Sequence, residues 1–346
     1  MKILVCRFSS LGDVLLTTPV LRLLRKKFPS AQIDFLVKKE FADVLRFNRH
    51  ISRIREFSGN NFIQLAECRS ALQKAHYDIV IDLHNSLRSR FLRFLLARQV
   101  FVVRKDIIKR WLLVNFKKNY YPSIISVPEK YIRTIAPLGI VNDDEGLELC
   151  TDENTSGCLQ TKFTEWNIDG NTPLFVIAPT AKHTTKMWLP EYYIALGKKI
   201  AKEHNAKICV SGAGEEKKYC DNIASEINAA CAHSAISTAG ILSLLETAAL
   251  VERCSAVITN DSAMMHIAAA LQKKVIAIFG STVEEFGFFP YRTNNKVVQN
   301  IGLQCRPCSH IGKYECPQLH FKCIKDISVE HVYESLLQLL GATNSK

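Results

Sequence analysis

The segment Thr259–Phe279 (TNDSAMMHIAAALQKKVIAIF) limits the possible folds more than any other part of the sequence. Here a strand-length apolar run, a polar turn, an Ala-rich helix and a second apolar run follow one another, at 256–259, 260–262, 263–271 and 275–279. This order predicts a β-α-β unit. In open α/β sheets, ligands bind beyond the carboxyl ends of the strands, where a helix N-terminus offers N–H groups to a phosphate. Asp261 and His266 are therefore candidate site residues. The alternative is that Asp261 only caps the helix and that His266 packs in the core.

The same alternation of strand and helix patterns runs through the whole chain. The expected strands outside this unit are 2–8, 32–37, 51–57, 78–83, 174–178 and 207–211. The expected helices are 15–27, 40–46, 62–75, 91–97, 131–138, 191–203, 217–227, 242–252 and 329–340. Such alternation is typical of parallel sheets covered by helices, so we expect an α/β fold.

A polar stretch divides this alternation into two series. A chain of 346 residues is long enough for two domains, and 141–171 is rich in Asp, Glu, Asn, Thr and Gly. We therefore expect four parts: an N-terminal domain (1–150), a linker (151–172), a C-terminal domain (173–327), and a C-terminal helix with its tail (328–346). In two-domain folds of this type the last helix often packs back across the domain junction.

Composition narrows the classes of partner. The formal net charge is +12, which favours anionic partners such as nucleic acid, an anionic membrane surface or a phosphorylated substrate. Nucleic acid is the weaker choice because no zinc-finger, RNA-recognition or basic coiled-coil pattern is present. The twelve cysteines are scattered, which favours reduced thiols in a cytosol. We expect neither a membrane span nor a signal peptide.

The segment 104–133 has a composition of its own. Eight Lys or Arg residues are mixed there with Trp111, Phe116, Tyr120 and Tyr121. Two interpretations stay open: a solvated helix with its basic residues outward, or a surface that meets an anionic lipid interface.

Five motifs, in this order, resemble those of the ADP-heptose:lipopolysaccharide heptosyltransferases, glycosyltransferase family nine. They are SSLGDV (9–14), DLH (82–84), KMW (186–188), GAGE (212–215) and NDSAMMH (260–266). The resemblance extends from Met1 to about Ile327. It implies a GT-B architecture, with two Rossmann-like domains facing across a cleft, acceptor on the N-terminal one and nucleotide-sugar on the C-terminal one. The last helix, on this expectation, packs back toward the N-terminal domain.

The resemblance also implies an activity. Family members transfer heptose, or a related sugar, from an ADP-sugar to the inner core of lipopolysaccharide, with inversion and without a metal or other cofactor. The expected partners are the nucleotide-sugar donor, an anionic glycolipid acceptor and the anionic leaflet of the inner membrane, on whose cytoplasmic side the protein would act. The alternatives are a different nucleotide-sugar or acceptor, or nucleotide-sugar binding without transfer. A dinucleotide oxidoreductase is disfavoured because no G-x-G-x-x-G follows the first strand.

On the acceptor side, the resemblance implies that Asp13 is the base that deprotonates the acceptor hydroxyl. Its alternative role is to cap the helix that follows, and one carboxylate can do both. The expected acceptor-binding residues are Ser10, Gly12, His84 and Arg88. Further basic candidates for acceptor contact are Lys38, Lys39, Arg90 and Lys105.

On the donor side, Lys186 with Thr184 and Thr185 matches the diphosphate loop of the family; the alternative for Lys186 is a surface lysine beside a core Trp188. The ribose would be held by Glu215 or Glu216, which the sequence does not distinguish. The remaining expected donor residues are Asp261 for the sugar hydroxyls, the backbone of Ser262, Ala263 and Met264 for phosphate, and His266 alongside. Several members have glycine where this chain has Ala263, which leaves less room for close backbone approach.

A cysteine-rich stretch, 305–323, follows the last motif. Cys305, Cys308, Cys316 and Cys323 begin with a CxxC spacing that suits a structural metal, although the later spacing is irregular for a zinc ribbon. Ordinary reduced packing cysteines are the other interpretation.

Overall fold

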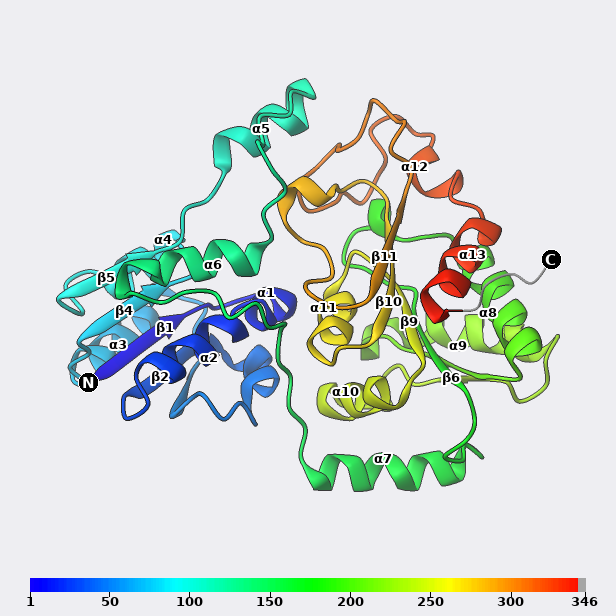
Figure 1. Ribbon diagram of the computed structural model, residues 1–346, viewed down its shortest axis with the longest axis horizontal. Coiled ribbons are helices and arrows are strands. Elements are labelled where there is room, and N and C mark those ends of the chain that lie inside the picture. The colour runs from blue at the N-terminus through cyan, green and yellow to red at the C-terminus, as the bar shows by residue number, and fades with distance from the viewer. Residues whose placement is uncertain (342–346) are drawn as a thin grey trace. The chain divides into compact units, whose positions relative to one another are not determined.

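The computed structural model describes residues 1–341; the last five residues of the expected C-terminal tail, 342–346, lie outside this range. The described chain divides into two compact units, each built on a parallel sheet of its own (Figure 1). The first unit contains Met1–Asp106 and Ile125–Cys150, and the second contains Ile107–Ile124 and the chain from Thr151 onward. The predicted α/β class is confirmed.

The sheet of the first unit has the order β3-β2-β1-β4-β5, with every neighbouring pair parallel. Its strands are β1 (Lys2–Cys6), β2 (Gln32–Lys38), β3 (Arg53–Phe57), β4 (Ile79–Asp82) and β5 (Gln99–Val102). Its helices are α1 (Leu11–Leu15), α2 (Thr18–Lys27), α3 (Phe62–Gln73), α4 (Leu87–Arg93) and α6 (Val127–Ile135), and a 3-10 helix covers Lys39–Leu45. The central strands β1 and β4 are the most apolar because helices cover both faces of the sheet.

The sheet of the second unit has the order β11-β10-β9-β6-β7-β8, again with all neighbours parallel. Its strands are β6 (Leu174–Ala178), β7 (Lys207–Val210), β8 (Ala235–Ser237), β9 (Ala256–Asn260), β10 (Lys274–Phe279) and β11 (Asn295–Gln299). Its helices are α5 (Ile107–Phe116), α7 (Glu153–Glu165), α8 (Pro190–His204), α9 (Lys217–Asn228), α10 (Leu244–Arg253), α11 (Ala263–Ala270), α12 (Lys322–Lys325) and α13 (Val329–Leu340). The predicted β-α-β unit is confirmed as β9, α11 and β10.

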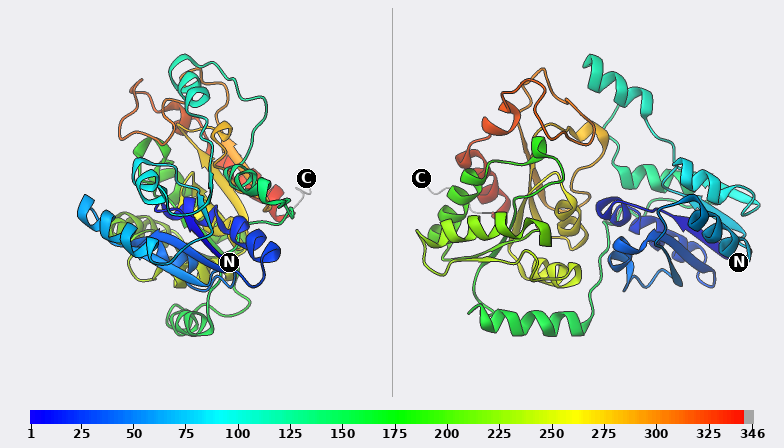
Figure 2. Two further views of the ribbon diagram at one scale, coloured as in Figure 1. Left: turned by 90° about the vertical axis from the view of Figure 1, so that its left-hand side faces the viewer. Right: turned by 180° about the vertical axis from the view of Figure 1, so that it is seen from behind.

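Helices cover the second sheet in two groups. On one side α8 contacts α9 and α13, while on the other α10 contacts α11 and α7 (Figures 1 and 2). The segment 151–172, expected as a linker, contains α7 and so contributes a helix to this unit. The C-terminal helix α13 packs on β10, β11 and α8, all in its own unit. No helix within residues 1–341 has both the length and the apolar character that crossing a bilayer requires.

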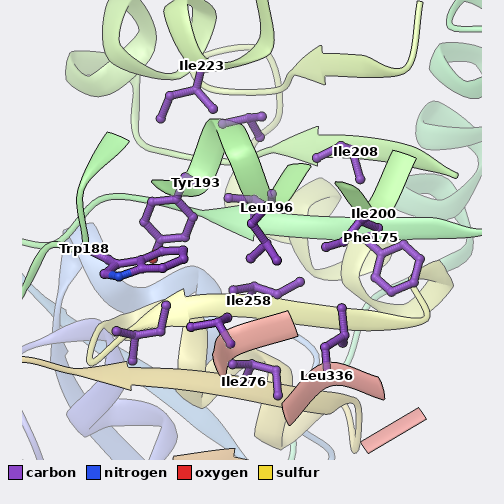
Figure 3. Packing of buried hydrophobic residues seen from close by; sticks show 14 of the residues in the cluster. Phe175, Trp188, Tyr193, Leu196, Ile200, Ile208, Ile223, Ile258, Ile276 and Leu336 are labelled. Atoms are coloured by element: carbon purple, nitrogen blue, oxygen red, sulfur yellow. The ribbon is translucent and has the colours of Figure 1, made fainter. Parts of the chain in front are cut away.

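The core of the second unit lies between its sheet and α8, α9 and α13. Phe175, Ile208, Ile258 and Ile276 project from four neighbouring strands toward Leu196 of α8 (Figure 3). All five side chains are almost completely buried. Interiors of this kind are close-packed, so removing atoms leaves a cavity rather than a collapsed core.

We therefore predict that Leu196→Ala lowers the free energy of unfolding by about 2–5 kcal/mol, as measured by urea denaturation. Leu319→Ala is the matched control, because Leu319 is 83% exposed and should change stability by less than about 0.5 kcal/mol. Equal stability losses in the two variants would contradict this account of the core.

Candidate functional site

Asp13 lies in the first turn of α1, directly after β1, and its carboxylate is held from two sides. The backbone N–H and the hydroxyl of Ser10 donate to Asp13 Oδ2 at 3.2 and 2.9 Å. On the other side, Arg7 Nη2 lies 2.6 Å from Asp13 Oδ1. Ser10 is the N-cap of the helix, so Asp13 closes its capping box while its side chain stays partly exposed.

Arg7 connects Asp13 to the neighbouring strand. Its Nη1 donates to the carbonyl of Leu83 at 2.8 Å, and its Nε donates to the carbonyl of Ser9 at 2.8 Å. Burial favours the neutral form of Asp13, but the charge of Arg7 and the hydrogen bonds from Ser10 outweigh burial and hold the pKa of this carboxyl below its usual value. Asp13 is therefore an ionised acceptor of fixed orientation at neutral pH.

His84 follows β4, which pairs with β1, so the loops bearing His84 and Asp13 share one edge of the sheet. Asp82 Oδ1 accepts the backbone N–H of His84 at 2.9 Å, and the imidazole packs edge-on against Phe8. Burial, together with the charges of Arg7 and Lys105, lowers the pKa of His84 to about 4. The ring is therefore neutral at physiological pH, and its buried Nδ1 has no hydrogen-bond partner among residues 1–341.

The other residues expected on the acceptor side differ in exposure. Gly12 is buried, whereas Ser10, Arg88 and Arg90 are exposed. An open cavity of about 480 Å³ lies at the carboxyl ends of β2 and β3, lined by Lys38, Lys39, Glu40, Asp43 and residues 57–60. The sheet edge that carries Asp13 thus also carries a cavity bordered by two lysines.

A second cavity, of about 430 Å³, lies at the amino ends of the strands in the sheet of the second unit. It is lined by none of the expected site residues.

Lys186 and Asp261, expected to bind the donor, are in direct contact in the second unit. Lys186 Nζ lies 2.7 Å from Asp261 Oδ2, and the Thr282 hydroxyl donates to the same oxygen at 2.7 Å. These residues follow β6, β9 and β10, which are neighbouring strands, so all three lie at the carboxyl edge of the sheet. Both side chains of the ion pair are mostly buried.

Asn260 fixes the loop that carries Lys186. This amide is fully buried; its Oδ1 accepts the backbone N–H of Trp188 at 2.9 Å, and its Nδ2 donates to the carbonyl of Pro179 at 2.9 Å. The two ends of the loop are thus bound to the last residue of β9. Trp188 lies fully in the core, as one interpretation of the sequence expected, but Lys186 is directed to Asp261 rather than to open solvent.

Thr185 anchors this loop to the cysteine-rich stretch. Its buried hydroxyl donates to the carbonyl of Lys313 at 3.0 Å and accepts from the Lys313 N–H and the Ser281 hydroxyl. Gly312, at φ +100°, permits this close approach, because a Cβ there would lie 2.6 Å from the Cβ of His183. The Thr185 hydroxyl is therefore engaged within the protein, whereas Thr184 is exposed.

The two glutamates of the GAGE turn differ in their surroundings. Glu216 Oε2 accepts the Thr180 hydroxyl at 2.8 Å and the Ala213 N–H at 2.7 Å. Thr180 follows β6, so these bonds keep Glu216 at the carboxyl edge of the sheet beside the Lys186 loop. Glu215 is exposed.

The helix start that follows β9 is formed by Ser262, not by Asp261. Ser262 is the N-cap of α11, and the first helical residues Ala263 and Met264 are partly exposed. His266, one turn further, is 4% exposed and has its ring centroid 6.5 Å from that of Phe288. Asp261 therefore does not cap the helix, and His266 is buried beside Phe288.

Of the two interpretations of the cysteine-rich stretch, the described residues do not show the geometry of a metal site. No three His, Cys, Asp or Glu side chains among residues 1–341 lie where they could hold one ion. Cys305 Sγ lies 3.8 Å from His320 Nε2, and burial raises the pKa of Cys308 and brings that of Cys323 to about 12. Burial thus favours the protonated form of Cys308 and Cys323.

Arg306, between the first two cysteines, has a structural role that sequence analysis missed. Its guanidinium donates to the carbonyls of Gly280 and Thr282 at 2.6 and 2.7 Å, and also to the carbonyl of Asn300. It therefore holds the loop after β10, which carries Thr282. The contacts of Thr282, Lys313 and Arg306 had no sequence signal, because each joins segments that only the tertiary structure brings together.

Comparison with known proteins shows the family of the chain. Residues 65–318 match the model of "Glycosyltransferase family 9 (heptosyltransferase)". A lipooligosaccharide heptosyltransferase 2 from Haemophilus ducreyi is 26% identical, with 99% of this chain and 100% of the relative covered. The corresponding enzyme from Campylobacter jejuni is 27% identical, with 98% of each covered.

Solved structures show the same fold. A family 9 glycosyl transferase from Veillonella parvula superposes with a TM-score of 0.80 at 20% identity, covering 99% of this chain and 97% of its own. E. coli heptosyltransferase WaaC, solved with ADP, superposes with a TM-score of 0.68 at 19% identity, covering 98% of this chain and 100% of its own. WaaC was also solved with ADP-2-deoxy-2-fluoro heptose. The expected GT-B fold is confirmed. The family model matches most of the length of this chain, so the chain belongs to glycosyltransferase family 9, the heptosyltransferases.

Proposed function

We propose that the protein transfers heptose from ADP-heptose to the inner core of lipopolysaccharide by a single displacement at the anomeric carbon. The observation that carries this proposal is the Lys186–Asp261 pair at the carboxyl edge of the second sheet, held there by Asn260 and Thr282. The names of the relatives, and the ADP and ADP-sugar analogue held by WaaC, support the donor and the acceptor class.

On the donor side, Lys186 supplies positive charge to the diphosphate, whose negative charge grows as the sugar leaves. Asp261 orients the ammonium and accepts hydrogen bonds from sugar hydroxyls. The N–H groups of Ser262, Ala263 and Met264 add donors at the start of α11. For the ribose, Glu216 is the better choice of the two glutamates because Thr180 holds it beside the Lys186 loop.

On the acceptor side, Asp13 receives the proton of the attacking hydroxyl. Its lowered pKa makes it a weak base in the ground state, so the proton moves late, when the hydroxyl oxygen has begun to bond to carbon and has become acidic. Arg7 and Ser10 keep the carboxylate in one orientation while this happens. Neutral His84 offers a buried ring nitrogen to a neighbouring hydroxyl of the acceptor.

The acceptor is an anionic glycolipid on the cytoplasmic face of the inner membrane. Lys38 and Lys39 border the cavity next to the Asp13 loop, where they would meet carboxylates or phosphates of the acceptor. Arg88, Arg90 and Lys105 are further basic side chains after β4 and β5. Peripheral contact with an anionic leaflet fits the net charge of +12.

Asp13→Asn tests both the base and the activity. We expect transfer from ADP-heptose to a purified core acceptor, followed by mass spectrometry, to fall by about 10²–10⁴-fold because the amide cannot take the proton. Calorimetric ADP affinity should stay within about twofold of wild type. Asp221→Asn, on the exposed surface of α9, is the control and should transfer normally. If Asp13→Asn transfers heptose as fast as wild type does, Asp13 is not the base. If the wild-type protein binds the donor but transfers no sugar, the alternative of nucleotide-sugar binding without transfer is favoured.

Arg7→Gln should move the acidic limb of the pH–rate profile. Without the guanidinium, burial raises the pKa of Asp13, so a higher pH is needed to ionise the base. We expect the acidic limb of kcat/KM to shift upward by about one pH unit or more, with Arg7→Lys falling between Arg7→Gln and wild type. An unchanged limb in Arg7→Gln would mean that this pair does not control the proton transfer.

Lys186→Gln should weaken binding of ADP, measured by calorimetry, by about tenfold or more, because a charge-assisted contact to phosphate is lost. Lys182→Gln is the matched control: Lys182 is an exposed lysine of the same loop and should bind ADP as wild type does. Equal affinities for the two variants would argue against Lys186 as the diphosphate residue.

A further inference from the structure

The helix α5 has its apolar residues on the outside. Ile108 is 73% exposed and Trp111 is 54% exposed, and Ile107 is also more than half exposed. The same holds for Phe116 at the end of the helix, whose ring packs edge-on against Trp111. Leu113 is the single buried residue of α5. Exposed apolar patches of this kind mark sites of interaction with proteins or membranes.

Helical geometry gathers these residues on one face. At 100° per residue, Ile107, Ile108 and Trp111 fall within one arc of about 100°, and the buried Leu113 points to the opposite side. Lys109 and Arg110 lie on either side of Leu113, about 40° and 60° from it, and the exposed Asn115 falls within the arc. The exposed face of the helix is therefore mainly apolar, and the two cationic side chains lie toward its inner side.

The charge around this face is almost entirely positive. Residues 104–124 contain six Lys or Arg residues and one acidic residue, Asp106, whose carboxylate lies 2.9 Å from Lys130. Lys109 also lies over the ring of Tyr121. An apolar strip with cationic and aromatic residues around it is complementary to an anionic lipid surface, where apolar side chains enter the acyl boundary and cations meet the headgroups.

The inner side of the segment is tied to the second unit. Lys117 Nζ donates to the carbonyl of Pro307 at 2.6 Å, and Asn119 Nδ2 donates to Glu285 at 3.2 Å. Leu113 is buried on the same side. These contacts hold the segment in place while its apolar face remains exposed.

We infer that α5 docks the protein on an anionic membrane surface through Ile107, Ile108 and Trp111, with Lys109 and Arg110 contacting headgroups. The inference rests on the proposed function in one respect, because a membrane-borne acceptor gives the docking its purpose. Vesicle binding needs neither donor nor acceptor, so it is measured independently of sugar transfer.

The test is co-sedimentation of the full chain with vesicles of phosphatidylglycerol and phosphatidylcholine in equal parts, and with phosphatidylcholine alone. Wild type should bind the anionic vesicles and not the neutral ones, and salt should weaken the binding. Ile108→Ser/Trp111→Ser should reduce binding about tenfold or more. Lys109→Gln/Arg110→Gln should reduce it about 25-fold, at about fivefold per charge. Both variants should transfer heptose to a soluble acceptor fragment at the wild-type rate.

Two controls locate the effect. Ile301→Ser/Leu319→Ser removes two equally exposed apolar residues elsewhere in the second unit and should bind as wild type does. The fluorescence of Trp111 should shift to the blue with anionic vesicles, and Trp111→Phe should lose that shift while still binding. Trp188 gives no such signal because it is fully buried.

Three results would overturn the inference. The first is equal binding of wild type to neutral and anionic vesicles, or no binding at all. The second is retention of binding in Ile108→Ser/Trp111→Ser together with its loss in Phe94→Ser/Leu95→Ser, which would assign the contact to the exposed apolar pair after α4. The third is a change of oligomeric state in Ile108→Ser/Trp111→Ser by analytical ultracentrifugation without vesicle binding, which would make the face a contact between copies of the chain.

Discussion

The amide of Asn260 is the constraint on which the carboxyl edge of the second sheet, the proposed donor site, depends. It binds one backbone group at each end of the loop between β6 and α8, and it does so in an interior where an unpaired polar group is costly. The two ends of the loop are therefore fixed beside β9, and between them Lys186 lies against Asp261. A cation and a carboxylate that are 75 residues apart in sequence are thus brought into contact.

The first unit uses the same physical device with a different side chain. Arg7 binds the carbonyls of Ser9 and Leu83, which follow adjacent strands, and presents its remaining nitrogen to Asp13. In both units a polar side chain at the end of a strand joins two neighbouring loops and fixes the charge of the site. Orientation is thereby set before any substrate binds, which lowers the entropic cost of reaching a reactive geometry. The lowered pKa of Asp13 is a consequence of this arrangement.

The cysteine-rich stretch contributes architecture instead of chemistry. Arg306 holds the loop after β10, and Lys313 holds Thr185, so this late segment braces the two loops that carry Thr282 and Lys186. Its spacing favoured a metal site as one of two interpretations, but within residues 1–341 no three potential ligands lie where they could hold one ion. A CxxC spacing constrains two residues, whereas ligation requires four side chains to meet, and sequence alone does not specify that.

The sequence by itself determined the α/β class, the two series of strands and the loops that carry the site, because buried strands and amphipathic helices impose their periods on the residues. It located β1, β4, β6 and β9 well, yet it missed the edge strands β5, β8 and β11, which are short and partly exposed. Only the tertiary structure decided that Lys186 meets Asp261, that His266 is buried beside Phe288 and that Glu216 lies beside Thr180. The order of strands in a sheet sets which loops become neighbours, and that order depends on long-range packing that no local pattern encodes.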